Sequence, residues 1–311
     1  MSSDYEAITK DNIRRRGEEF ADIGRFLAGK LYGDRSHFIF ELLQNAEDAL
    51  ACRRLEEPEG DFPCDVKFKL SKDHLEVSHY GKPFDQDDVR AICDVLRGTK
   101  TERLDQIGTF GIGFKSVYAF TESPEIHSGD EHFAIEQFIR PRAVPPRQLD
   151  APQQTLFYFP FDHPHFGPEV AFELIQAKLR SLGPRSLLFL HHVQNLHWII
   201  EGADGGLYMR ETHPSEMGGS LVQIIGEGMG QQDTEEDWLV IQRDVLHPTR
   251  PEKLPIKMAY RLKRSSDGQA VQPLPRSPLT AYFPTAKETG LTFLIHGPFA
   301  PTPARDNIQS D

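Results

Sequence analysis

The sequence has little cysteine, no long hydrophobic run and fewer basic than acidic side chains. Its 311 residues include three cysteines, Cys52, Cys64 and Cys93, which cannot all pair and show no metal-ligand spacing. This usage favours a reducing cytoplasm. No stretch approaches the roughly 18 apolar residues of a membrane helix, and the first residues lack the basic start and apolar core of a secretion signal. The 47 acidic and 35 basic residues give a net charge of −12, which argues against a nucleic-acid surface. We therefore expect a cytoplasmic chain with neither a membrane nor a nucleic-acid partner.

The length and composition predict a folded chain of two domains. A hydrophobic content of 38% and a charged content of 26% are typical of globular proteins, and 311 residues suffice for two cores. The pattern changes near residues 185–195, so we expect one domain over residues 1–190 and a second over 191–311. No closing element is evident after Ile308, so one expectation is that the second domain is truncated and the chain is part of a longer protein.

Hydrophobic periodicity predicts the elements of both domains. Helices are expected at 5–32, 36–55, 85–96, 114–119 and 168–182, and strands at 66–70, 75–77, 131–140, 155–161, 196–200, 222–225, 238–241 and 256–262. Residues 97–106 are polar and rich in glycine, threonine and lysine, which is typical of a loop.

The first motif that indicates chemistry is a set of polar residues within the second predicted helix. Glu41, Asn45 and Asp48 stand at i, i+4 and i+7 and therefore share one face, opposite apolar residues that can pack on a sheet. A carboxylate and an amide one turn apart suit a hydrated Mg²⁺ ion, and a nearby carboxylate can hold a water molecule as general base. From these residues alone, a solvated helix face stays an equal alternative.

A second motif places three glycines, Gly108, Gly111 and Gly113, immediately before a predicted helix. Glycine lets the backbone approach a ligand, and a helix N-terminus offers unpaired N–H groups to phosphate. The motif is not a P-loop, because Phe114 stands between Gly113 and Lys115. It is not a dinucleotide fingerprint either, because a third glycine and a preceding strand are missing. A glycine-rich turn that only serves packing is the alternative.

Together the two motifs resemble the Bergerat-fold, or GHKL, ATPases, a family that includes gyrase and heat shock protein 90. The box E-x-x-x-N-x-x-D-A matches at Glu41, Asn45, Asp48 and Ala49, and the box G-x-x-G-x-G-F matches from Gly108 to Phe114. The sequence around these two boxes is most similar to the sacsin-like and heat shock protein 90-like branch. The resemblance implies an α+β fold: a two-layer α/β sandwich, with a mixed, mostly antiparallel sheet covered by helices, followed by a smaller α/β domain like a chaperone middle domain.

The resemblance also assigns roles to individual residues. Glu41 would be the general base that activates water, and Asn45 would be the Mg²⁺ ligand. The cofactor-binding residues that it implies are Asn45, Asp48, Ala49, His79, Gly81, Lys100, Gly108, Phe110, Gly111, Ile112, Gly113, Phe114 and Thr155. Lys100 lies where the family has its ATP lid. Arg305 resembles the second-domain arginine that reaches the γ-phosphate in the chaperone branch.

One family box departs from its usual pattern. The box D-x-G-x-G, whose aspartate reads the adenine amino group, corresponds here to the segment from His79 through Gly81 to Pro83. A neutral imidazole can accept one hydrogen bond from an exocyclic amine, but it lacks the charge and the second oxygen of a carboxylate. The chain therefore departs from the family at the residue that selects adenine.

The resemblance implies Mg²⁺-dependent ATP binding and slow hydrolysis to ADP and phosphate, which would drive a conformational cycle as the ATPase module of a larger sacsin-like or chaperone-like protein. The implied cofactors are ATP and Mg²⁺. The implied partners are a protein client or partner domain and, when ATP binds, a second copy of the chain. The alternative function is a regulatory or structural nucleotide-binding module with little hydrolysis, which the departure at His79 motivates.

Overall fold

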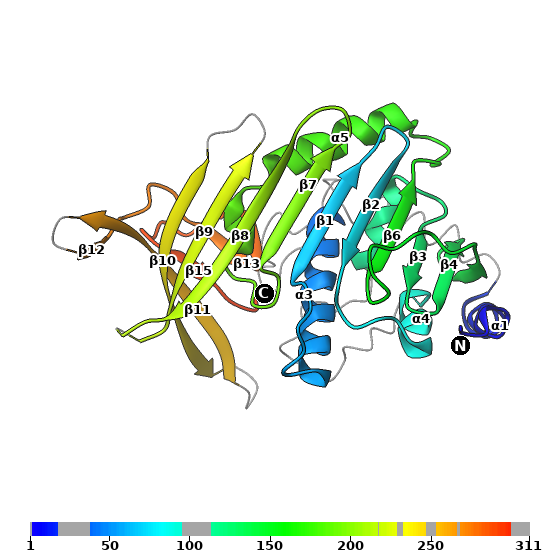
Figure 1. Ribbon diagram of the computed structural model, residues 1–311, viewed down its shortest axis with the longest axis horizontal. Helices are drawn as coiled ribbons and strands as arrows, with labels where there is room; N and C mark the ends of the chain where they lie inside the picture. Colours follow the sequence, from blue (N-terminus) through cyan, green and yellow to red (C-terminus); the bar gives the residue numbers. More distant parts are fainter. Residues whose placement is uncertain are drawn as a thin grey trace. The chain divides into compact units, whose positions relative to one another are not determined.

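The computed structural model of the protein describes residues 2–17, 38–94, 113–216, 218–228, 233–246, 253–265 and 268–299. The chain forms two compact units, one comprising Met1–Ser181 and His197–Gly205, and the other Leu182–Leu196 and Gly206–Asp311. Figure 1 follows the chain from its blue N-terminal helix to its red C-terminal strands. The two units are described separately below.

The first unit combines helices with an antiparallel set of strands. Its elements are α1 (Tyr5–Arg16), α3 (Phe38–Glu56), β1 (Asp65–Leu70), β2 (His74–His79), α4 (Gln86–Ile92), the 3-10 helix η2 (Gly113–Ala119), β3 (Glu125–Ser128), β4 (Glu131–Glu136), β5 (Arg140–Ala143), β6 (Thr155–Pro160), α5 (Pro168–Ser181) and most of β7 (Asn195–Ile200). The strand order is β7-β1-β2-β6-β3-β4-β5, and every pair from β1 to β5 along this order is antiparallel. The α1 helix packs at the β5 edge (Figure 1).

The predicted hairpin between β1 and β2 is confirmed. Val66, Phe68 and Leu70 of β1 are fully buried, while the residues between them are half-exposed. Such alternation is expected of strands with one face on a core, because successive side chains point to opposite faces. The register pairs Leu70 with Leu75, so the apolar residues of both strands line the same face.

The core of the first unit lies between this apolar face and α3. The Phe38 ring of α3 lies 5.5 Å from the Phe120 ring and 6.5 Å from the Phe159 ring of β6, measured between centroids. The α5 helix contacts β1 and lies beside α3, since the Lys178 ammonium is 4.5 Å from the centroid of the Phe40 ring. Rings and aliphatic side chains from several elements thus bury one another, which is the main stabilising contribution.

Several predicted boundaries differ from the observed ones for local backbone reasons. The first helix ends at Arg16, because Gly17 has a φ of +86° and its N–H bonds back to Ile13. The predicted strand 131–140 is two strands, β4 and β5, since Gln137 and Phe138 have φ values of +51° and +70° and form a turn. The segment 114–119 is helical as predicted but belongs to a 3-10 helix.

The second unit is made almost entirely of strands. Its elements are the 3-10 helix η3 (Pro184–Leu187), β8 (Gly205–Pro214), β9 (Ser220–Gly228), β10 (Thr234–Leu246), β11 (Lys253–Ser265), β12 (Gly268–Val271), β13 (Pro278–Ala281), β14 (Phe283–Glu288) and β15 (Leu294–His296). The order is β14-β13-β15-β11-β10-β9-β8, with β12 paired to β11. All these pairs are antiparallel except β13 with β15.

The fold class expected from the sequence, a helix-covered two-layer α/β sandwich followed by a smaller α/β domain, is wrong. The described residues contain fifteen strands, with both antiparallel and parallel pairing, and four α-helices, so strand is the main regular structure. The difference arises mainly in the second half, where the 13-residue strands β10 and β11 pair with each other over ten residues. On β11, buried Lys257 and Ala259 alternate with half-buried Met258 and Tyr260, a two-residue period that does not suit a helix.

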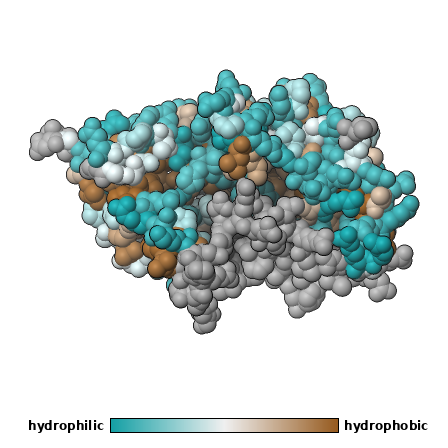
Figure 2. All heavy atoms as spheres, turned by 90° about the horizontal axis from the view of Figure 1, so that it is seen from below, coloured by the Kyte–Doolittle hydropathy of each residue, from teal (hydrophilic) through white to brown (hydrophobic). Residues whose placement is uncertain are grey.

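The surface is mainly hydrophilic on the face seen in Figure 2, with hydrophobic side chains gathered toward the side of the second unit. The exposed large apolar residues of the described second unit are Val245, Leu246, Val271 and Leu291. Among the helices that the structure describes, none has the length and apolar character needed to cross a lipid bilayer.

Candidate functional site

The polar motif of α3 lies on one side of a largely buried helix. Glu41 and Asp48 are each 7% exposed, and Asn45, between them, is half-buried. The apolar side of the same helix is fully buried as predicted: Ile39, Leu43, Ala46 and Leu50 have no exposed surface. Two carboxylates and one amide are therefore held on a rigid element, where oxygen ligands for Mg²⁺ fit.

The segment after β2 is fastened to this helix by backbone contacts. The N–H of Lys82 donates to the carbonyl of Ala49 at 2.9 Å, and the Arg53 guanidinium donates to the carbonyl of Tyr80 at 2.8 Å. A Cβ atom on Gly81 would lie 2.4 Å from the Cβ of Ala49, closer than any real side chain could stand. The structure thus brings Ala49 of the E-x-x-x-N-x-x-D-A box into direct contact with Gly81, which corresponds to the first glycine of the D-x-G-x-G box.

His79 precedes this contact and is nearly inaccessible, with 2% of its surface exposed. The backbone N–H of Gly81 donates to its Nδ1 at 3.0 Å. Burial lowers the pKa of the imidazole to about 4, so the ring is neutral at physiological pH. In a neutral ring whose Nδ1 accepts, Nε2 carries the hydrogen. The accepting nitrogen that the sequence argument offers to an exocyclic amine is therefore already engaged within the chain.

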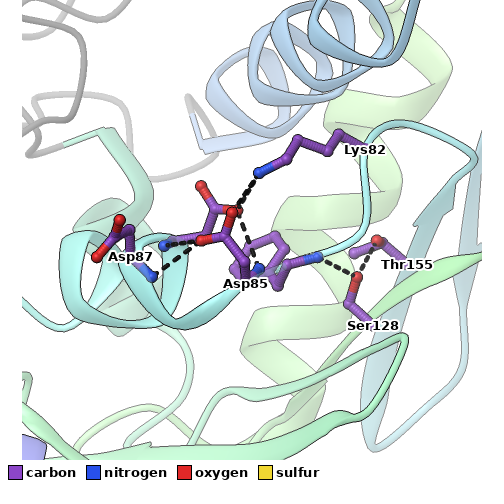
Figure 3. Close-up of polar contacts among 7 residues, drawn as sticks. Lys82, Asp85, Asp87, Ser128 and Thr155 are labelled. Atoms are coloured by element: carbon purple, nitrogen blue, oxygen red, sulfur yellow. Dashed lines mark hydrogen bonds and ion pairs between the residues drawn. The ribbon is translucent and has the colours of Figure 1, made fainter. Parts of the chain in front are cut away.

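His79 belongs to a row of polar residues across three strands. It stands opposite Thr155 in the β2–β6 register, and Thr155 stands opposite Ser128 in the β6–β3 register. The Ser128 Oγ and Thr155 Oγ1 atoms are 2.6 Å apart, and Oγ also accepts the N–H of Phe84 at 3.0 Å (Figure 3). Sequence reasoning missed Ser128, since the four-residue strand β3 was not recognised and only strand pairing places this serine beside Thr155.

The loop that leads from this row into α4 is held by an ion-pair cluster. Lys82 Nζ lies 2.5 Å from the Asp85 carboxylate and 3.1 Å from the Asp88 carboxylate (Figure 3). Asp85 is also the N-cap of α4, accepting the N–H groups of Asp87 and Asp88 in a capping box. The cluster thus holds together residues 82–88, which directly follow Gly81 in the sequence.

Of the glycine box, the structure describes Gly113 and Phe114. Gly113 opens η2, and the Phe114 ring lies 5.9 Å from the Phe157 ring and 6.3 Å from the Phe159 ring of β6. Phe157 in turn lies 5.9 Å from the His79 ring. The end of the glycine box therefore meets the same aromatic cluster as His79, and η2 also contacts α3.

The lysine after the glycine box has an internal role. Lys115 is 4% exposed, and its Nζ donates to the carbonyls of Ile92 at 2.7 Å and Phe138 at 2.5 Å. Burial lowers the pKa of its ammonium to about 8. The position of Lys115 agrees with the sequence argument against a P-loop, because its donors serve backbone carbonyls instead of phosphate.

The remaining predicted site residues lie outside the described residues. These are Lys100, Gly108, Phe110, Gly111, Ile112 and Arg305. Over the described part of the chain, no group of three or more His, Cys, Asp or Glu side chains is arranged to hold a metal ion. An Mg²⁺ ion that takes one ligand from Asn45 and others from a triphosphate and water would not need such a group.

Comparison with known proteins shows that this chain is similar to sacsin-like proteins and, over a shorter stretch, to chaperones. Residues 72–137, which include His79, Gly81, Phe114 and Ser128, match the model of the Sacsin domain family. The chain is 29% identical over 326 residues to Protein NO VEIN of Arabidopsis thaliana, covering 94% of this chain and 11% of that protein. It is 25% identical over 367 residues to Sacsin of Homo sapiens, covering 90% of this chain and 8% of that protein.

A shorter similarity extends to chaperones. The chain is 31% identical over 131 residues to Chaperone protein HtpG of Methylobacterium sp. (strain 4-46), covering 35% of this chain and 21% of that protein. These matches support a distant sacsin-like and heat shock protein 90-like relationship. The chain spans 11% and 8% of the length of its two long relatives, so it corresponds to a small part of each.

Proposed function

We propose that the first unit binds a nucleoside triphosphate with Mg²⁺, with ATP as the nucleotide implied by the sequence, and hydrolyses it slowly to the diphosphate and phosphate. One observation carries this proposal. The α3 helix, the segment His79–Gly81 and the end of the glycine box, which are far apart in the sequence, meet around β6. Helix-borne carboxylates next to a close backbone approach suit phosphate chemistry that depends on Mg²⁺.

Each motif has a role in the proposed reaction. Glu41 takes a proton from the attacking water, which adds to the γ-phosphorus as the bond to the β–γ bridging oxygen breaks. The Asn45 side-chain oxygen is the protein ligand of Mg²⁺, which neutralises phosphate charge when bound. The backbone N–H groups of Gly108, Gly111 and Gly113 hold phosphate oxygens. Lys100 and Arg305 supply positive charge to the same phosphates.

The second unit and the relatives suggest how hydrolysis would be used. The similarity to Chaperone protein HtpG supports a conformational cycle that acts on a protein client or partner domain. Arg305 of the second unit would sense the γ-phosphate, and two copies of the chain would associate when nucleotide binds. Cys52, Cys64 and Cys93 form no disulfide in the described part of the chain, which favours a reducing cytoplasm as the place of this activity.

A second function has a specific observation in its favour. Since Nδ1 of His79 already accepts the Gly81 N–H, the unit lacks at this position the acceptor with which the family reads adenine. Weak or altered base recognition suits a module in which the nucleotide is a regulatory or structural ligand with little turnover.

Calorimetric titration with ATP, ADP and GTP, with and without Mg²⁺, tests the proposal together with a phosphate-release assay. Hydrolysis predicts binding that Mg²⁺ strengthens and phosphate release above a nucleotide-only blank. Binding without phosphate release would favour the second function, in which the nucleotide is a regulatory or structural ligand. Failure of all three nucleotides to bind or to raise the melting temperature would rule out both functions.

A further inference from the structure

The neighbouring strands β3 and β4 of the first unit (Figure 1) carry two histidines that face each other. His127 and His132 are directly opposite in the strand register, and their Nδ1 atoms are 3.2 Å apart. His127 has no exposed surface, and His132 is half-buried. A hydrogen bond between two ring nitrogens needs one donor and one acceptor, so one hydrogen lies between the rings.

The contact on the other side of His127 determines which of the two rings donates. Nε2 of His127 lies 3.3 Å from the Oε2 atom of Glu125, and the same oxygen accepts the Nε–H of Arg147 at 2.7 Å. A carboxylate that is paired with a guanidinium is ionised and only accepts, so Nε2 of His127 carries a hydrogen. Nδ1 of the neutral His127 ring is then the acceptor, and the Nδ1–H of His132 is the donor.

The direction of this bond sets how many protons the pair can take up. A first added proton can go to Nε2 of His132, which leaves the Nδ1–H donor in place. A second proton has to go to Nδ1 of His127, where two N–H groups and two positive charges would then face each other. Burial lowers the pKa of His127; the hydrogen bond and charge of Glu125 oppose this shift, and the charges of His132 and Arg147 add to it. The pair therefore admits one added proton and opposes the second.

The pairing of β3 with β4 also connects the N-terminal helix to the rest of the strands in the first unit. The backbone N–H of His132 donates to Tyr5 Oη at 3.1 Å, and the Tyr5 hydroxyl donates to Glu131 at 2.6 Å. Asp130 adds a negative charge near His132. Because α1 also contacts β5, which pairs with β4, a loss of pairing between β3 and β4 would loosen the attachment of α1 as well.

We infer that His127 and His132 form an acid-sensitive clasp between β3 and β4. While the pair holds no added proton or one, the two rings stay bonded and the strands stay paired. When the second proton binds, the rings separate and the pairing of β3 with β4 weakens. The opening equilibrium of the hairpin then rises by up to about tenfold for each pH unit of acidification, because the open form binds one proton more than the closed form. The clasp needs no nucleotide, so the inference goes beyond the proposed function.

Nitrogen-15 NMR of the whole 311-residue chain, labelled at its 13 histidines, reads the direction of the bond. A ring nitrogen that carries a hydrogen differs in chemical shift from one that does not. At pH 8 we expect the hydrogen of His132 on Nδ1 and that of His127 on Nε2. The signals are assigned by their loss in the variants His127→Gln and His132→Gln. A hydrogen on Nδ1 of His127, or on Nε2 in both rings, would overturn the inference.

Amide hydrogen exchange at pH 7 and pH 5, corrected for the intrinsic exchange rates, tests the clasp itself. On acidification the protection of the β4 amides should fall roughly tenfold more than that of the β1 amides in the same unit. His132→Gln places an uncharged amide opposite His127, and its oxygen can accept the Nδ1–H of the charged ring. This variant should lose the extra acid sensitivity of β4.

His165→Gln, an exposed position in the first unit, is the control and should keep the acid response of the unmodified chain. His127→Gln is the second variant if His132→Gln does not fold, because glutamine at that position takes up no proton and should also remove the extra response of β4. Equal protection of β4 and β1 at both pH values in the unmodified chain would overturn the inference, since the rings would then separate without opening the hairpin. An extra loss at β4 that persists in a folded glutamine variant would overturn it as well.

Discussion

Gly81 and Ala49 touch backbone to side chain, so closely that a Cβ on Gly81 would lie 2.4 Å from the Ala49 Cβ and 2.7 Å from its carbonyl carbon. The adjacent Lys82 N–H donates to the Ala49 carbonyl at 2.9 Å, so a shift of either partner would break a hydrogen bond as well. This contact joins α3 to the segment that follows β2, two parts of the chain that are separated in the sequence by β1 and β2. The small size of both residues is a requirement of this contact.

Replacing Gly81 by alanine should destabilise the first unit. The added methyl group meets backbone atoms of α3, which cannot rotate away, and overpacking of this kind costs about 1–3 kcal/mol. Thermal unfolding should show a lower melting temperature, and nucleotide binding should weaken because the segment from His79 to Lys82 must shift. Gly167→Ala is the matched control, since a Cβ there meets nothing within 4 Å. Equal melting temperatures for both variants would contradict the packing argument.

Glu41→Gln should separate binding from turnover. Glutamine keeps the size and most of the packing of a side chain that is 7% exposed, but it cannot take a proton from water. Loss of a general base lowers the rate about 10²- to 10⁴-fold, so phosphate release should fall by that factor while the nucleotide Kd stays nearly constant.

The control for Glu41 is Glu56→Gln at the exposed end of the same helix, which should leave turnover unchanged. Undiminished phosphate release from purified Glu41→Gln protein would remove this residue from the proposed mechanism.

Asn45→Ala should abolish the Mg²⁺ dependence of nucleotide binding. The half-buried amide is the one predicted metal ligand, and without its oxygen the ion keeps only phosphate and water ligands. The ratio of Kd values without and with Mg²⁺ should approach one by calorimetry. Asn45→Asp restores an oxygen ligand and should restore the ratio; a Mg²⁺ dependence that survives in Asn45→Ala would place the ion elsewhere.

The sequence allowed good prediction where structure depends on near neighbours. The face of α3 that carries Glu41, Asn45 and Asp48 follows from helical spacing alone, and the β1–β2 hairpin follows from alternation over a short turn. By contrast, the split of the segment 131–140 depends on positive φ values at Gln137 and Phe138, which are not glycines and carry no local turn signal.

The parts that could not be predicted depend on contacts between distant residues. The proportion of sheet was underestimated because the ten-residue pairing of β10 with β11 is set by the register between the two strands, which no local sequence pattern specifies. Likewise, the position of Ser128 depends on β3 pairing with β6. The tautomer of His79 depends on the N–H of Gly81, whose position is fixed by α3. A motif can thus indicate where a ligand lies without showing which hydrogen bonds remain for it.

Acidification should destabilise the first unit through His79. Burial lowers its pKa to about 4 from the usual histidine value of 6.5, so between these pH values the unfolded chain binds a proton at this residue while the folded chain does not. The stabilisation by a neutral His79 is therefore complete above pH 6.5 and is lost as the pH falls toward 4. Between pH 7 and pH 5 the loss amounts to about 2 kcal/mol.

A comparison with His79→Asn isolates this effect, because His191 and His296 of the second unit also have pKa values lowered by burial, each to about 3. Urea unfolding at pH 7 and pH 5 in a Trp238→Phe background leaves Trp198 as the one fluorescent tryptophan. Trp198 belongs to the first unit, so its signal follows that unit. The chain with His79 should lose about 2 kcal/mol more than the His79→Asn variant on acidification. If the two proteins lose the same free energy of unfolding, then His79 is protonated in the folded chain at pH 5. Burial would then not keep its ring neutral.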